Sequence, residues 1–185
     1  MKIRQLSVAI LLLILAVGMG LAQQPGVERL APFVPSPQLV VERMLEAADV
    51  KPGETVIDLG CGDGRILIAA ARDFNAKGIG VELSSDLVKQ ARDEVSKLGL
   101  SNRVTILQGD LLAADLKSAD VVTLYLLTES NDRLRPILEK SLRPGARVVS
   151  HDFKIRGWKP VEVATVAVSG RVHTIYVYQM PPVKD

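Results

Sequence analysis

Residues 55–64 decide the fold of this chain, and they read Thr55-Val56-Ile57-Asp58-Leu59-Gly60-Cys61-Gly62-Asp63-Gly64. The apolar first half carries β-branched residues and the second half places glycines at alternate positions, which predicts a buried strand that turns sharply into a helix. Glycine permits positive φ and has no Cβ, so a ligand can approach the backbone closely at such a turn. The following helix presents free N–H groups at its N-terminus to that ligand.

Two familiar nucleotide-binding motifs do not match this turn. In the dinucleotide fingerprint G-x-G-x-x-G the third glycine would occupy the position of Arg65, and the Gly-Lys-Ser/Thr of a phosphate-binding loop does not follow. Instead, Asp58 ends the strand, and Glu82 ends a second apolar stretch about twenty residues further on, at the position that binds ribose hydroxyls in doubly wound folds. The alternative, a tight turn whose glycines serve packing only, stays open at this point.

The rest of the chain alternates between helical and strand patterns. Helices are predicted over residues 38–48, 66–74, 85–98 and 131–142, and strands over residues 56–59, 78–82, 104–107, 119–126 and 146–150. Two β-branched runs, 161–168 and 172–178, follow and are joined by Ser169-Gly170, a two-residue hairpin signal. Such alternation is typical of a parallel sheet wound by right-handed crossovers. The predicted fold is therefore α/β: a Rossmann-like, doubly wound, mostly parallel seven-stranded sheet with a C-terminal antiparallel hairpin.

Residues 1–22 are predicted to be a signal peptide or a membrane anchor. Lys2 and Arg4 precede an uncharged stretch that ends in small residues at the spacing of a signal-peptidase site, and its length is borderline for crossing a bilayer. Positive charge before this segment predicts that the rest of the chain lies outside the cytoplasm. Residues 23–37, with four prolines, are predicted to be a linker, and residues 38–185 to be the domain.

Composition narrows the function further. The net charge is only +2, with basic residues scattered among acidic ones, so no nucleic-acid partner is expected. The one cysteine, Cys61, has no partner for an internal disulfide and is expected to be a small buried residue within the glycine turn. No metal site is predicted.

Four carboxylates, Asp58, Asp63, Glu82 and Asp110, are expected at or just beyond the carboxyl ends of strands, where ligands bind in such sheets. Together with the glycine turn, this pattern resembles the class I, seven-β-strand, S-adenosylmethionine-dependent methyltransferases. The resemblance implies that Glu82 takes the ribose hydroxyls and Asp110 the adenine amino group of that cofactor. It also implies that the turn takes the methionine part, through Asp58, Gly60, Cys61, Gly62, Asp63 and Gly64.

Three segments narrow the resemblance: residues 31–37 (Ala-Pro-Phe-Val-Pro-Ser-Pro), residues 58–71, and Trp158-Lys159-Pro160. They are similar to the membrane-anchored protein-lysine methyltransferases that include the enzyme modifying the ATP synthase c-subunit. This resemblance implies a lysine of a protein, including a membrane protein, as methyl acceptor, and a role for Phe33 to Pro37 in closing the substrate side of the pocket. Two alternatives stay open: a small-molecule O- or N-methyltransferase and a non-catalytic cofactor-binding module.

The sequence does not assign a catalytic acid or base. Tyr125, Glu129, His151 and Asp152 are candidates only by their position near the ends of the fourth and fifth strands. The Asn/Asp-Pro-Pro-aromatic motif common in methyltransferases of planar amino groups is replaced by residues 124–128, Leu-Tyr-Leu-Leu-Thr, which argues against a base or glutamine amide as acceptor. Because S-adenosylmethionine is made inside cells, the side of the membrane stays open.

Overall fold

The computed structural model describes residues 30–185. The predicted signal peptide or anchor and the first half of the predicted linker lie outside the described residues. Within residues 30–185, none of the helices is both long and apolar enough to cross a lipid bilayer.

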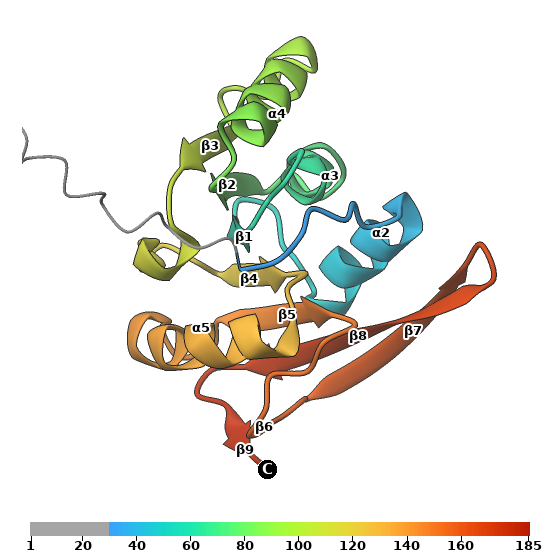
Figure 1. Ribbon diagram of the computed structural model, residues 1–185, viewed down its shortest axis with the longest axis vertical. Helices are drawn as coiled ribbons and strands as arrows, with labels where there is room; N and C mark the ends of the chain where they lie inside the picture. The colour runs from blue at the N-terminus through green and yellow to red at the C-terminus, as the bar shows by residue number, and fades with distance from the viewer. Residues whose placement is uncertain (1–29) are drawn as a thin grey trace, which may run out of the picture.

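A seven-stranded sheet forms the centre of the molecule, with the strand order β3-β2-β1-β4-β5-β8-β7 (Figure 1). Strands β1 to β5 run parallel, whereas β8 pairs antiparallel with both β5 and β7. The strands are β1 Thr55–Leu59, β2 Lys77–Glu82, β3 Val104–Gln108, β4 Val121–Leu124, β5 Arg147–His151, β7 Glu162–Val168 and β8 Arg171–Gln179. This arrangement confirms the predicted fold class, including the C-terminal hairpin. Ser169 and Gly170 turn that hairpin with φ of 51° and 80°, as a two-residue primed turn requires.

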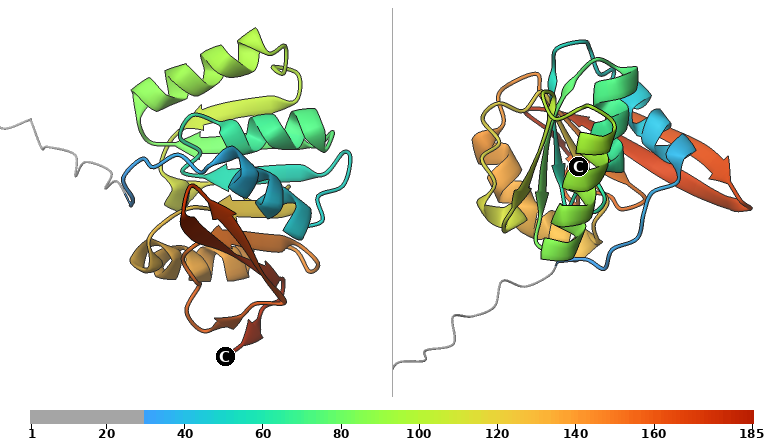
Figure 2. Two further views of the ribbon diagram at one scale, coloured as in Figure 1. Left: turned by 90° about the vertical axis from the view of Figure 1, so that its right-hand side faces the viewer. Right: turned by 90° about the horizontal axis from the view of Figure 1, so that it is seen from above.

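Helices cover both faces of the sheet. They are α2 Gln38–Ala47, α3 Arg65–Asp73, α4 Ser85–Lys97, the short 3₁₀ helix η1 Leu111–Ala113, and α5 Thr128–Ser141. Figure 2 shows α2, α3 and α4 on one face, with α5 on the other. Strand β1 is buried on both sides, since Val56 packs into the core under α2 to α4 while Ile57 packs into the core under α5. The strand therefore reads as a nearly continuous apolar run.

Three local features differ from the sequence prediction. Strand β4 spans only Val121–Leu124, because the chain leaves the sheet at Tyr125 beside the cavity described below. Helix α5 begins at Thr128 rather than Asn131, since its short polar first turn resembles a loop in sequence. A two-stranded sheet of β6 Trp158–Lys159 and β9 Val183–Lys184 was not predicted, because two-residue strands carry no periodicity. It places Trp158 in the core, where the indole N–H donates to Glu139 at 2.7 Å.

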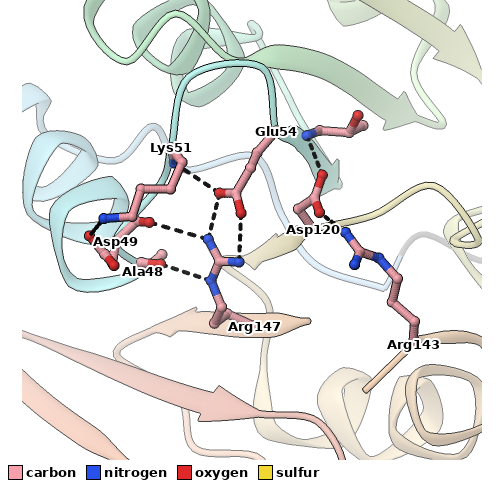
Figure 3. Close-up of polar contacts among 8 residues, drawn as sticks. Ala48, Asp49, Lys51, Glu54, Asp120, Arg143 and Arg147 are labelled. Atoms are coloured by element: carbon pink, nitrogen blue, oxygen red, sulfur yellow. Dashed lines mark hydrogen bonds and ion pairs between the residues drawn. The ribbon is translucent and has the colours of Figure 1, made fainter. Parts of the chain in front are cut away.

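A group of ion pairs fixes the amino ends of the central strands (Figure 3). The Arg147 guanidinium donates two hydrogen bonds to the Glu54 carboxylate, at 2.9 and 2.6 Å, and one to the Ala48 carbonyl at 3.0 Å. Asp120 accepts the backbone N–H of Thr55 at 2.8 Å. These contacts hold β1, β4 and β5 in register at the end opposite to the glycine turn, so the carboxyl ends of the strands are fixed relative to one another.

Candidate functional site

A cavity opens at the carboxyl ends of β1, β2 and β4. Its walls are the glycine turn, the loops after β2, β3 and β4, and residues 30–36, which we call the entry segment. Seven of the eight predicted cofactor-binding residues line it: Asp58, Gly60, Cys61, Gly62, Asp63, Glu82 and Asp110. The four carboxylates expected from the sequence thus meet at one cavity, because the carboxyl ends of parallel strands share one edge of the sheet.

The eighth residue, Gly64, serves packing instead of lining the cavity. It precedes α3 with φ of +79°, and a Cβ built on it would lie 3.3 Å from the Cβ of Ala91 in α4. Glycine at this position lets α3 start close to its neighbour helix. Gly64 thus has a packing role in this turn, and its predicted contact with the cofactor stays a prediction.

Gly62 lies directly beneath Phe33 of the entry segment. Its φ is +54°, and an added Cβ would come 2.4 Å from Cε2 of the Phe33 ring. Only glycine can both adopt this backbone conformation without strain and leave room for the ring. The expected closing role of the segment from Phe33 to Pro37 fits this geometry, since Phe33 to Ser36 all line the cavity.

Glu82, at the end of β2, is held by two backbone donors. Its Oε2 accepts the N–H of Gly62 at 3.0 Å, and its Oε1 accepts the N–H of Ser84 at 2.8 Å. The carboxylate is buried, and these two bonds fix its plane at the cavity wall. Because each carboxylate oxygen has a second lone pair, Glu82 can still accept hydrogen bonds from a pair of ribose hydroxyls.

Asp58 is a buried carboxyl group at the floor of the cavity. Burial raises the pKa of Asp58 to about 7, and repulsion from Glu82 adds to the rise, while the hydrogen bond from Thr123 opposes it. Asp58 lines the cavity and is 2% exposed. A group with this pKa can accept a cationic ligand by becoming ionised, so Asp58 suits the amino end of S-adenosylmethionine.

Arg65 joins the glycine turn to the entry segment. Its Nε lies 2.9 Å from Oδ1 of Asp63, and its Nη1 donates to the backbone carbonyl of Ser36 at 2.8 Å. Arg65 thus occupies the position of the third glycine in a dinucleotide fingerprint, and its side chain links the turn to the entry segment. This role was not predicted from the sequence, where the Asp-Gly-Arg order was its only signal.

Asp110 combines a cap with a position at the cavity. Its Oδ1 accepts the N–H of Leu112 at 2.8 Å and so caps η1. The same carboxyl group lines the cavity next to Leu111. The expected contact with an adenine amino group and the cap are compatible, because a carboxylate offers about four acceptor positions.

Cys61 is a packing residue in the turn. Burial raises the pKa of its thiol well above the ordinary value, and the nearby Asp58 carboxylate adds to this effect. A Cβ built on Gly80 of β2 would lie 2.6 Å from the Cys61 sulfur, so the side chain fills the space above that glycine. The thiol is therefore neither ionised nor free to act as a nucleophile.

Of the four candidate catalytic residues, Tyr125 lines the cavity. Its ring stacks on the imidazole of His151, with the ring centroids 3.8 Å apart. His151 is fully buried behind this wall, and its Nδ1 lies 3.0 Å from the Ser36 hydroxyl. Burial lowers the pKa of His151 to about 4, so this imidazole is neutral near pH 7. Asp152 follows it behind the same wall, and Glu129 is exposed on the first turn of α5.

The fold and this cavity together define a class I S-adenosylmethionine-dependent methyltransferase. The model of the ANTKMT methyltransferase domain matches residues 58–162, and the chain belongs to that family. The protein-lysine N-methyltransferase of Saccharolobus islandicus (strain REY15A) is 49% identical over 80% of this chain and 92% of its own length. The mouse adenine nucleotide translocase lysine N-methyltransferase is 34% identical over 78% of this chain and 65% of its own length.

The resemblance noted in the sequence is also confirmed. The mouse lysine N-methyltransferase of the ATP synthase c-subunit is 28% identical over 80% of this chain and 58% of its own length. Among solved structures, an RNA methyltransferase from Salinibacter ruber in complex with S-adenosyl-L-homocysteine matches with a TM-score of 0.75 and 49% identity. The match covers 80% of this chain and 94% of that one. S-Adenosylhomocysteine is what S-adenosylmethionine becomes after methyl transfer, so S-adenosylmethionine is the cofactor of this enzyme.

Proposed function

We propose that this enzyme transfers a methyl group from S-adenosylmethionine to the side-chain nitrogen of a lysine in a protein. The observation that carries the proposal is the cavity beside the glycine turn, where Tyr125 and the entry segment form the wall next to the predicted cofactor site. The names of the Saccharolobus islandicus and mouse relatives support the same acceptor.

The main contributions of the protein to this reaction are to align the acceptor with the methyl group and to exclude water. S-Adenosylmethionine supplies a methyl group already activated by positive sulfur, and a new N–C bond forms as the S–C bond breaks. The acceptor must first give up its ammonium proton, since only a free lone pair can attack. Tyr125 lies at the cavity wall and Phe33 covers the glycine turn, so these side chains would orient the acceptor and keep solvent away.

RNA is the second candidate acceptor, and one observation favours it. The solved relative from Salinibacter ruber, at 49% identity, is described as an RNA methyltransferase. Electrostatics favour a protein instead, because the net charge is only +2 and the basic residues are scattered among acidic ones.

A labelling experiment separates the two acceptors. The full chain is incubated with methyl-labelled S-adenosylmethionine and an extract of the source cells, and the products are treated with protease or with ribonuclease. We expect protease-sensitive label that appears as methyl-lysine after hydrolysis. The Glu82→Ala variant serves as the matched control and should label the extract more weakly at the same concentration of S-adenosylmethionine. Label that ribonuclease removes would reject the lysine proposal.

We also propose that residues 1–22 direct the chain to a membrane and that a membrane protein is its substrate. The charge pattern of Lys2, Arg4 and the following uncharged stretch supports this localisation. Phe33 and Val34 add exposed apolar side chains at the cavity. Fractionation of cells that express the full chain or a form without residues 1–22 tests the proposal. Protein in the soluble fraction in both cases would overturn it, and protease protection would report the side of the membrane.

A further inference from the structure

Three side chains behind the cavity wall converge on one point. Nε2 of His151 lies 2.8 Å from Nδ1 of His173, and Oδ2 of Asp152 lies 3.4 Å from the first and 3.3 Å from the second. His151 ends β5, Asp152 follows it with φ of +60°, and His173 comes from the antiparallel partner β8. Both imidazoles are almost fully buried, at 0% and 5% exposure.

Hydrogen bonds can join only two of the three pairs of atoms in this triangle. Three atoms that are all in mutual contact need alternating donors and acceptors, and any placement of protons on a triangle leaves one pair of like groups facing each other. A metal ion above the triangle would satisfy all three lone pairs at once. Ligand atoms about 2.1 Å from one ion lie about 3.0 to 3.4 Å apart, which is close to the three distances observed.

We propose that His151, Asp152 and His173 form a binding site for one divalent transition-metal ion, of the kind that prefers imidazole ligands, such as Zn²⁺. The site is separate from the cofactor cavity and lies behind it.

The surroundings of the three residues fit this assignment. Metal-bound histidines generally donate their second ring N–H to an oxygen, and Nδ1 of His151 lies 3.0 Å from the Ser36 hydroxyl. Asp152 is oriented through its other oxygen, which accepts the N–H of Thr174 at 2.8 Å. Through Ser36 the ion would hold the entry segment against β5 and β8, and it therefore acts as a positioning ion and not as a reactant.

Arg171 is a cation beside the site. Its Nη2 lies 2.7 Å from Oδ2 of Asp152, and its side chain is 60% exposed. An exposed guanidinium can turn into solvent when an ion binds, and the carboxylate oxygen has a second lone pair. Arg171 thus supplies a matched control, because its removal alters the neighbourhood of Asp152 and leaves all three ligands in place.

The test uses the untagged full chain, freed of metal by chelation and titrated with Co²⁺ and then with Zn²⁺. The background is low because the sequence contains only two histidines and one cysteine, which is buried. We expect one equivalent of Co²⁺ to bind with visible absorption, Zn²⁺ to displace it, and the melting temperature to rise with either ion.

Two ligand variants and one control decide the outcome. His173→Ala and Asp152→Asn should each bind the ion at least about tenfold more weakly. Asp152→Asn keeps the side-chain oxygen that accepts the N–H of Thr174, so this variant still tests the site if His173→Ala fails to fold. Arg171→Gln should bind at least as tightly as the unaltered chain. Equal affinity in the unaltered chain and all three variants would mean that the ion binds elsewhere, which would overturn the proposal. A lack of stoichiometric binding to the unaltered chain would also overturn it. Loss of binding in Arg171→Gln would do the same.

Discussion

The hydroxyl of Thr123 in β4 donates a hydrogen bond to the Asp58 carboxyl group in β1 across 2.8 Å. Both groups are buried, and β1 and β4 pair in parallel, with Asp58 directly opposite Thr123. The neighbouring strand thus provides a partner for a carboxyl group that has little access to water. Sequence alone gives no reason to connect two residues that are far apart along the chain.

Asp58 should make stability depend on pH. Its pKa of about 7 in the folded chain lies above the value of about 3.9 in an unfolded chain. The folded state therefore holds the proton more tightly, and the contribution of this group to the free energy of unfolding is complete below about pH 4 and is lost as the pH rises through 7. We expect the loss to be at most about 4 kcal/mol, since one pKa unit corresponds to about 1.4 kcal/mol.

Urea unfolding of the cofactor-free chain at pH 5 and pH 8 measures this dependence. The Asp58→Asn variant cannot ionise at this position, so it should not show this pH-dependent loss. The free energy of unfolding of the variant minus that of the unaltered chain should therefore be larger at pH 8 than at pH 5. A difference that is the same at both pH values would show that Asp58 has an ordinary pKa.

Replacement of Glu82 by Ala should weaken binding of S-adenosylmethionine. The variant loses charge-assisted hydrogen bonds to the ribose, worth about 1 to 3 kcal/mol, and leaves the N–H groups of Gly62 and Ser84 without their carboxylate. Calorimetric titration should show a dissociation constant raised about 5- to 150-fold. Glu82→Gln keeps one acceptor oxygen and should lose less. An unchanged dissociation constant in Glu82→Ala would reject the ribose assignment.

Gly62 and Phe33 should be coupled in stability. Gly62→Ala introduces a Cβ at a residue with φ of +54° and pushes against the Phe33 ring, so we expect a loss of about 1 to 2 kcal/mol from strain alone, plus a steric part. In Gly62→Ala combined with Phe33→Ala the steric part disappears. Denaturant unfolding of the two single variants and the double variant should therefore give non-additive effects. Additive losses would mean that Phe33 does not rest on the turn.

Arg65→Lys should loosen the entry segment. A lysine keeps the charge but cannot reach Asp63 and the Ser36 carbonyl at the same time with the planar geometry of a guanidinium. We expect faster hydrogen exchange in residues 30–36, while the exchange of the central strands stays the same. Arg72→Lys is a matched control, since Arg72 also pairs with an adjacent aspartate but lies on the exposed side of α3. Equal exchange in the two variants would contradict the anchoring role of Arg65.

Most of the fold could be predicted from local patterns in the sequence. The glycine turn after β1, the hairpin signal at Ser169-Gly170 and the alternation of helical and strand periods are short-range signals, and each fixes the backbone where it occurs. They also placed Asp58, Glu82 and Asp110 at one edge of the sheet, because the topology of a parallel sheet brings strand ends together. Short elements without periodicity, such as β6 and β9, could not be found in this way.

The contacts between distant segments were decided only by the tertiary structure. The sequence determined a methyltransferase turn with its carboxylates, since that turn needs glycine and acidic residues next to one another. It did not show that Phe33 covers Gly62, that Arg65 holds Ser36, or that His173 meets His151, because these pairs come from separate elements. Side chains of ordinary residues carry no local mark of their partners, and only the packing of β5, β8 and the entry segment brings them within reach of one another.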